Sequence, residues 1–174
     1  MTLPPGPMDP PDNPALPALA RMLVTDERFA SCRSTVMDAN PGMSDEMAGR
    51  IVEEGIKFVA ACSRNPGTGL APSRIVDEGW HALILHTAVY AELCTNLGGV
   101  FVHHYPGYDP TNYDPPVLDR TRKAIAALGW EADPRAVGAA VGRDARPGRG
   151  EVPARTGVHH PADAETGTPG RVSP

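Results

Sequence analysis

The sequence predicts an all-α fold: a small helical bundle of four to five helices with a long aromatic and histidine-rich loop and disordered ends. Two observations predict it. Apolar residues recur at helical spacing in several separate segments, and no segment alternates apolar and polar residues as a half-buried strand does. The length of 174 residues suits one ordinary domain with a tail. We therefore expect one helical domain over residues 12–133.

Both ends of the chain have the composition of disordered segments. Residues 1–11 are rich in proline, and the 40 residues from Arg135 onward contain 7 Gly and 5 Pro but no Leu, Ile, Met, Phe, Trp or Tyr. Such segments bury too little apolar surface to offset the entropy lost on ordering. We predict a disordered Pro-rich N-terminus over 1–11 and a disordered Gly/Pro/Arg-rich tail over 134–174.

The first two helical signals come before residue 40. Asn13 can cap a helix that has Pro14 at its first position. The apolar residues that follow it at helical spacing are Leu16, Leu19, Ala20 and Leu23. A second stripe lies within residues 28–37 and consists of Phe29, Cys32 and Val36. We expect this second piece to continue or bend the first helix.

The third helix begins at Ser44, because a serine followed by two acidic residues is a strong N-terminal signal. Its predicted core stripe consists of Met47, Ile51, Phe58, Val59 and Cys62. Gly55 falls within this stripe, where it marks either a weak point or a close helix crossing. The adjacent Glu53 and Glu54 could be read as an acid/base pair, but sequence neighbours on a helix point apart. We expect both on an exposed face.

The strongest helical signal runs from Ser73 to Asn96 and ends at Gly98 and Gly99. Its predicted buried arc consists of Val76, Trp80, Leu83, Ile84, Thr87, Ala91 and Cys94. Trp80, Tyr90 and Phe101 are expected in the core rather than in a ligand cage. A last helix begins after Asp114 and ends at Gly129, with four residues facing inward, namely Val117, Thr121, Ile125 and Leu128.

Charge and composition narrow the classes of function. Residues 1–134 carry 10 Lys/Arg against 17 Asp/Glu, so we expect no nucleic-acid partner for the domain. No apolar run approaches the length of a membrane span, and the first residues lack the pattern of a secretory signal. The three cysteines are odd in number and far apart, which indicates reduced thiols. We expect a cytoplasmic protein with no membrane contact.

Histidines give the chain its one chemically suggestive region, residues 77–106. Asp77 and His81 are one helical turn apart, so their side chains are neighbours that can bond each other or share a metal ion. His86 follows His81 by five residues, which turns it to a different face of a continuous helix and makes it a less suitable ligand. The spacing also differs from the HExxH motif, whose two histidines are four residues apart.

The segment from Val100 to Pro106 contains His103 and His104. Adjacent side chains of an extended segment point to opposite sides, so at most one of the pair should turn toward His81. The most specific hypothesis for this region is a metal site formed by Asp77, His81 and one of these two histidines, with Cys94 as a further candidate. Two imidazoles and a carboxylate with open positions suit zinc or non-haem iron, and an added thiolate shifts the preference toward zinc or copper.

Two functions therefore stay open. The first is a metal-binding helical domain that holds a divalent zinc, iron or copper ion and could act as a small metalloenzyme on an unknown substrate. The alternative is a non-catalytic protein-interaction module in which the same histidines and aspartate form a structural polar network. The partner would be a protein or a small molecule, and the sequence indicates neither the oligomeric state nor the metal.

Several motifs together resemble the bacterial members of the glycine-rich domain-containing protein-like family. The likeness covers about residues 41–106 and depends on Asp-Glu-Gly-Trp-His at 77–81, a Tyr and a Cys further along, and His-His-Tyr-Pro at 103–106. It implies a helical domain and no particular activity. The positions that match the motif are Asp77, His81, Cys94, His103 and His104. The chain departs from the pattern at Leu83, where the family has a second histidine, and at His86, where it has an aspartate.

Overall fold

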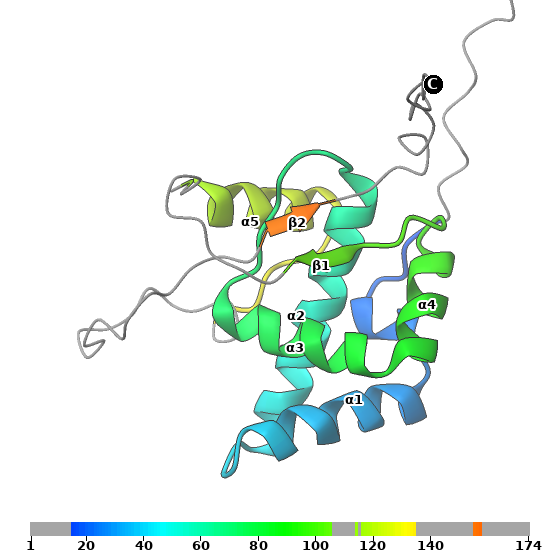
Figure 1. Cartoon of the computed structure of the whole chain (residues 1–174), viewed down its shortest axis with the longest axis vertical. Helices are drawn as coiled ribbons and strands as arrows, with labels where there is room; N and C mark the ends of the chain where they lie inside the picture. The colour runs from blue at the N-terminus through cyan, green and yellow to red at the C-terminus, as the bar shows by residue number, and fades with distance from the viewer. Residues whose placement is uncertain (1–14, 106–113, 115, 135–154, 158–174) are drawn as a thin grey trace, which may run out of the picture.

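The computed structural model describes residues 15–105, 114, 116–134 and 155–157, and it confirms the prediction of a small all-α fold. The elements in chain order are the 3₁₀ turn η1 (Ala20–Leu23), α1 (Asp26–Ala39), α2 (Asp45–Arg64), α3 (Arg74–Leu85), α4 (Thr87–Asn96), β1 (His103–Tyr105), α5 (Val117–Ala127) and β2 (Arg155–Gly157). Figure 1 shows α3 crossing in front of α2, with α1 beneath them and α5 at the opposite end. None of the described helices combines the length and apolar character needed to cross a bilayer.

Helix α2 is the centre of the core and packs most extensively against α3, with further contacts to α1 and α5. It begins as predicted, because the Ser44 hydroxyl accepts a hydrogen bond from the Met47 N–H at 3.2 Å. Every residue from Glu54 to Ser63 is buried, so the second half of the helix is surrounded on all sides. Gly55 lies where α3 crosses, which agrees with the expectation of a close helix crossing.

The predicted helix over residues 13–23 is wrong, since only the turn η1 forms within the described part of this stretch. Asn13 and Pro14 lie outside the described residues. Pro17 has no N–H to donate to a helix, and its carbonyl instead accepts a hydrogen bond from the Trp130 indole at 3.1 Å. Leu19 is extended, with φ −118° and ψ 129°.

Helix α1 is a separate helix rather than a continuation of this segment. Thr25 precedes it in an extended conformation, and the Thr25 hydroxyl accepts a hydrogen bond from the main-chain N–H of Arg28. The buried residues of α1 are Phe29, Cys32 and Val36, which are the three predicted from the stripe. The sequence therefore placed the inner face of this helix correctly and its beginning incorrectly.

The single helix predicted from Ser73 to Asn96 is also wrong, because the chain breaks at His86, which has φ −89° and ψ 66°. The Ser73 cap and the glycine stop are confirmed, with φ 113° at Gly98 and 82° at Gly99. The break rotates α4 relative to α3. Thr87 and Ala91 are exposed as a result, although both were expected in the buried arc. The buried residues of α4 are Val89, Tyr90, Leu93 and Cys94.

Two short strands form although the sequence predicts none. β1 pairs antiparallel with β2, and His104 lies opposite Thr156. Figure 1 shows β2, in orange, beside β1. Main-chain pairing over three positions requires no apolar side chains, so composition gives no sign of it. The domain bounds of 12–133 and the disorder of the two ends stay predictions, because residues 1–14, 135–154 and 158–174 lie outside the described residues.

Helix α5 forms as expected, with Val117, Thr121 and Ile125 buried. Leu128 is half-buried, and Gly129 ends the helix with φ 85°. The chain then returns to α2 through residues 130–134. Trp130 is 5% exposed, which places this returning segment against the core.

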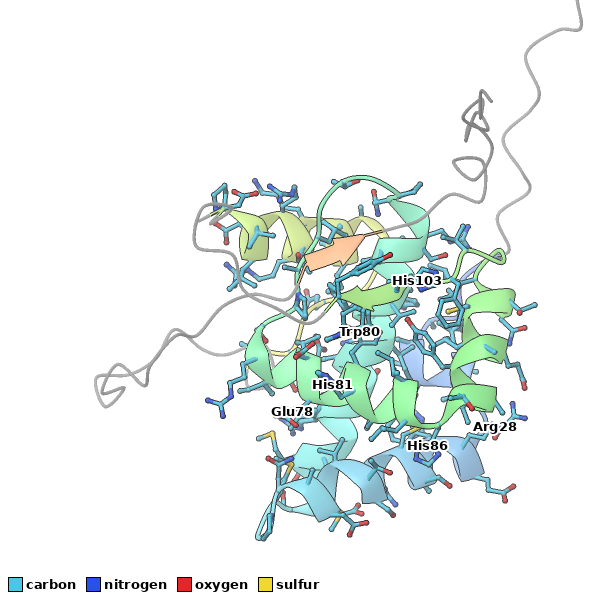
Figure 2. All side chains as sticks on the ribbon, viewed as in Figure 1. Arg28, Glu78, Trp80, His81, His86 and His103 are labelled. Carbon is cyan, nitrogen blue, oxygen red and sulfur yellow. The ribbon has the colours of Figure 1, made fainter. Side chains whose placement is uncertain are left out.

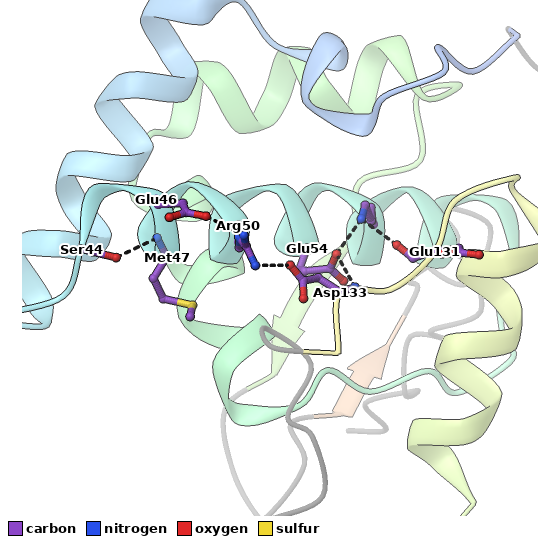
Figure 3. A network of polar contacts seen from close by, with 8 residues as sticks. Ser44, Glu46, Met47, Arg50, Glu54, Glu131 and Asp133 are labelled. Carbon is purple, nitrogen blue, oxygen red and sulfur yellow. Dashed lines mark hydrogen bonds and ion pairs between the residues drawn. The ribbon is translucent and has the colours of Figure 1, made fainter.

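The expectation that Glu54 is exposed is wrong. Its side chain is 1% exposed and accepts hydrogen bonds from Lys57 Nζ at 2.6 Å and from the Asp133 N–H at 3.0 Å. Lys57 also donates to the carbonyl of Glu131 at 2.8 Å. Figure 3 shows Glu54, Glu131 and Asp133 side by side along α2. Glu54 is buried because the segment after α5 covers this face of α2 and supplies main-chain partners. A helical wheel of α2 alone contains no information about that cover.

Candidate metal site

Asp77 and His81 lie on the same flank of α3, one turn apart. The Asp77 Oδ2 and His81 Nδ1 atoms are 3.3 Å apart, and the same ring nitrogen is 2.9 Å from the Asp77 carbonyl oxygen. A histidine that donates one ring N–H to a carbonyl or carboxylate keeps its other nitrogen for a metal ion. The side chain of His81 is 50% exposed, so the site opens to solvent on this side.

His104 approaches the same aspartate from β1. Its Nε2 atom lies 3.2 Å from Asp77 Oδ1, and its ring centroid is 4.5 Å from that of His81. The His104 side chain is only 12% exposed, because its ring also packs against the indole of Trp80 with centroids 4.6 Å apart. The two carboxylate oxygens of Asp77 thus face two different imidazoles.

One potential ligand atom from each of Asp77, His81 and His104 lies within 4.8 Å of the other two. We call these residues the Asp77–His81–His104 cluster. Two of the three belong to helix α3. The third, His104, belongs to β1 and follows Asp77 by 27 residues in the sequence. Figure 2 shows Trp80 and His81 together beneath β1. The fold therefore brings together two imidazoles and a carboxylate with no change of helix geometry.

His103, the other member of the pair, turns away from the cluster. It is exposed, and its ring lies 4.9 Å from Phe101 and 6.2 Å from Tyr105, centroid to centroid. This alternation is what the extended segment predicts. Phe101 shares the outward side and is 44% exposed, so the expectation that it belongs to the core is wrong. Val102 takes the inward place and is fully buried.

His86 lies apart from the cluster, near α1, as Figure 2 shows. Its Nε2 atom is 2.8 Å from Thr35 Oγ1. The sequence separated His86 from His81 by rotation around one helix, whereas the structure separates them because His86 ends α3. Its contact with α1 gives it a structural role at the break.

Cys94 is not part of the cluster either. It is 3% exposed and lies beside Tyr90 and the main chain of Val102, and burial raises the pKa of its thiol. A protonated thiol is a poor metal ligand, because metals bind the thiolate. All three cysteines lie in the described part of the chain, and all are buried as thiols rather than disulfides. Their role in the structure is that of small core residues.

The donor set of the cluster fits a divalent ion. Two ligand atoms around an ion at about 2.1 Å are roughly 3.0–3.5 Å apart. The 3.2 Å contact between His104 Nε2 and Asp77 Oδ1 falls in that range. The 3.3 Å contact between Asp77 and His81 is made by Nδ1, which also faces the Asp77 carbonyl, so the nitrogen that His81 keeps for an ion is Nε2. The same distances also allow Asp77 to accept a hydrogen bond from each imidazole directly. The geometry thus permits both a metal site and a satisfied polar network.

Sequence reasoning missed the surroundings of His104. It treated Trp80 only as a core residue, although the indole also forms one wall of the cluster. It also left open which of the two histidines turns inward. The alternation of the segment contained the missing signal. In an extended chain the β-branched Val100 and Val102 point to the same side as His104, whereas Phe101 and Tyr105 point to the same side as His103.

Comparison with known families gives one match. A family model described as UCP032817-like matches residues 21–110. This range contains the whole Asp77–His81–His104 cluster, and it contains the segment 41–106 on which the sequence resemblance depends. No curated protein and no solved structure matches the chain.

Proposed function

The chain belongs to the UCP032817-like family, and we propose that it binds one divalent metal ion through the Asp77–His81–His104 cluster. One observation carries this proposal: two imidazoles and a carboxylate from α3 and β1 converge with ligand atoms within 4.8 Å. Convergence from two elements distant in sequence supports a ligand set more strongly than the helical pair Asp77 and His81 alone. An aspartate and a histidine one turn apart are common neighbours on any helix.

The proposed ion is zinc or iron(II). Two histidines and one carboxylate on one side of an ion are the ligands of non-haem iron sites, and three protein ligands with a free position are typical of catalytic zinc. The exclusion of Cys94 from the cluster removes the thiolate that would favour copper. Because His81 is half exposed, the free positions of the ion would face solvent. A bound ion there would acidify a water ligand and supply a nucleophile for a small metalloenzyme.

The alternative function is a non-catalytic interaction module in which the cluster is a structural network. The observation that favours it is the direct contact of Asp77 with both imidazoles, which satisfies the carboxylate without an ion. In this reading the cluster fastens β1 to α3. The acidic surface of the domain then meets a protein partner.

Metal analysis distinguishes the two. We would express the protein with zinc, iron or copper supplied, purify it without chelators, and measure each metal per chain. The proposal expects about one ion in the wild type, and far less in the His81→Ala and His104→Ala variants. His103→Ala and His86→Ala are the matched controls and should keep the ion, because neither imidazole faces the cluster.

A metal-free wild type under all three conditions would overturn the proposal in favour of the interaction module. Equal loss in the His103 and His104 variants would indicate unspecific binding by surface histidines.

Two finer assignments belong with this proposal. The likeness to glycine-rich domain-containing proteins rests on the motifs at residues 77–81 and 103–106, and we infer a distant relationship from them. We also infer a cytoplasmic location, which is supported by the three buried thiols, since reduced cysteines are typical of that compartment.

A further inference from the structure

A buried hydroxyl connects α3 and the segment of β1, which carry the cluster, with the neighbouring helix α4. Tyr90, on α4, is 2% exposed, and its hydroxyl accepts a hydrogen bond from the Trp80 indole N–H at 3.0 Å. The same hydroxyl donates to the main-chain carbonyl of Val102, two residues before His104. Burial raises the pKa of Tyr90, so the hydroxyl stays protonated and remains a donor. One phenol thus links α3, α4 and the beginning of β1.

The second half of this arrangement is the contact between Trp80 and His104. The two rings pack with centroids 4.6 Å apart and planes at 55°. Trp80 follows Asp77 by three residues and precedes His81 by one, so its backbone is part of the helix that carries both. The indole ring of Trp80 therefore contacts His104 directly. Its N–H also bonds the Tyr90 hydroxyl, which in turn bonds the carbonyl of Val102, two residues before His104.

His104 needs such support more than the other two members of the cluster. Asp77 and His81 are fixed by the main-chain hydrogen bonds of α3, whereas His104 belongs to a strand of three residues. A metal site requires its ligands to be held within about 0.5 Å of the productive positions by packing and by outer hydrogen bonds. Trp80 of α3 and Tyr90 of α4 supply such contacts to this segment, in addition to those within the cluster itself.

We propose that Tyr90 and Trp80 are positioning residues for the metal site, with the Tyr90 hydroxyl setting the place of His104 through the Val102 carbonyl. This inference rests on the proposed function, because it assigns to two core residues a role toward the ligand set. Neither side chain would touch the ion. The hydroxyl matters through the backbone it holds, and the indole through the ring it packs against.

The test is Tyr90→Phe, which removes the hydroxyl and keeps the ring. Tyr105→Phe is the matched control, since it makes the same chemical change on β1 at a side chain that is 47% exposed. Ile125→Val, in the distant helix α5, controls for a general loss of stability. The measurement is the dissociation constant for Zn²⁺ by calorimetry, at a temperature where circular dichroism shows all variants folded.

Loss of a direct hydrogen-bond partner of a metal ligand usually costs 10–100-fold in affinity. Because the Tyr90 hydroxyl acts on His104 through the Val102 carbonyl, we expect about 10-fold, the low end of that range, for Tyr90→Phe. Both controls should bind Zn²⁺ as the wild type does. The visible spectrum of the Co²⁺ form gives a second readout, because it should change in Tyr90→Phe and not in Ile125→Val. Wild-type affinity and an unchanged Co²⁺ spectrum in Tyr90→Phe would overturn the inference and leave the proposed function intact.

A metal-free readout separates this inference from the proposed function. In the protein without metal, the ring current of Trp80 should shift the NMR signals of the His104 ring protons. We expect these signals to move toward unstructured values in Tyr90→Phe and to stay in place in Tyr105→Phe. If the wild type binds no metal, the proposed function fails, and the positioning of His104 by Tyr90 is then decided by these signals alone.

Discussion

Gly55 and Gly79 face each other where α2 and α3 cross, and neither position has room for a side chain. A Cβ atom on Gly79 would lie 2.1 Å from the Ile51 carbonyl oxygen, and one on Gly55 would lie 2.8 Å from the main chain of Gly79 and Trp80. Both distances are far below van der Waals contact. The crossing therefore sets how closely α3, which carries Asp77 and His81, approaches the core.

Alanine at this crossing should destabilise the protein. We expect Gly79→Ala and Gly55→Ala each to lower the free energy of unfolding by about 2–3 kcal/mol or more, since overpacking forces backbone to move. Gly49→Ala is the control on the same helix, because its Cβ would lie at an ordinary 3.6 Å from Arg33 Cδ. Alanine there should add about 0.5–1 kcal/mol through helix propensity. Urea unfolding measures all three, and an equal effect at the three glycines would contradict the close crossing.

Trp80→Ala should lower the free energy of unfolding by about 3–5 kcal/mol, the usual cost of removing a large buried aromatic side chain. The side chain is fully buried, and its ring lies 5.1 Å from that of Phe58. Phe101→Ala serves as comparison, because Phe101 is 44% exposed and should cost clearly less. Near-wild-type stability of the Trp80 variant would argue against its place in the core.

The parts of the fold that the sequence predicted correctly have local signals. Ser44 and Ser73 cap their helices with their own hydroxyls, and Gly129 has a positive φ that favours glycine. The break at His86 has no such signal, since the segment contains neither glycine nor proline there. It depends on how α4 packs and on the contact with Thr35 of α1, which are properties of the tertiary structure.

The candidate site divides in the same way. The proximity of Asp77 and His81 follows from helix geometry, which is why spacing alone could predict it. The approach of His104 depends on where β1 lies relative to α3, and the spacing of the sequence does not determine that placement. The alternation of Val100, Val102 and His104 would have favoured His104 over His103, but only with the added premise that the valines face the core.

Removing residues 135–174 should leave the melting temperature within about 2 °C of that of the whole chain. In the described part of the chain, the buried hydrophobic residues all lie between Ala20 and Trp130, and β2 adds main-chain pairs at three positions of β1. Differential scanning calorimetry measures the change. Amide exchange at residues 103–105 should become faster in the shortened chain, because their β2 partners are gone. A loss of several degrees would contradict the prediction and mean that the pairing of β2 with β1 contributes substantially to the stability of the domain.

The buried pair of Glu54 and Lys57 gives a prediction about pH. The Glu54 carboxylate is 1% exposed, and this burial raises its pKa, although the hydrogen bonds from Lys57 and from the Asp133 N–H oppose the change. A carboxyl whose pKa is higher in the folded than in the unfolded state binds its proton more tightly when folded. The stabilisation of the folded state that results from this tighter proton binding is fully present below the unfolded pKa of about 4.3. It is lost as the pH rises through the folded pKa.

Glu54→Gln removes this titration and keeps the shape of the side chain. We therefore expect the stability of the wild type, relative to that of Glu54→Gln, to rise as pH falls from neutral toward the unfolded pKa of about 4.3, because the folded wild type takes up its proton before the unfolded chain does. Urea unfolding at several pH values measures this difference. Glu46→Gln, at a carboxylate 77% exposed on the same helix, is the control and should show little change over that interval. The opposite trend, in which the wild type loses stability relative to Glu54→Gln as pH falls, would mean that the ion pair with Lys57 outweighs the cost of burying the charge.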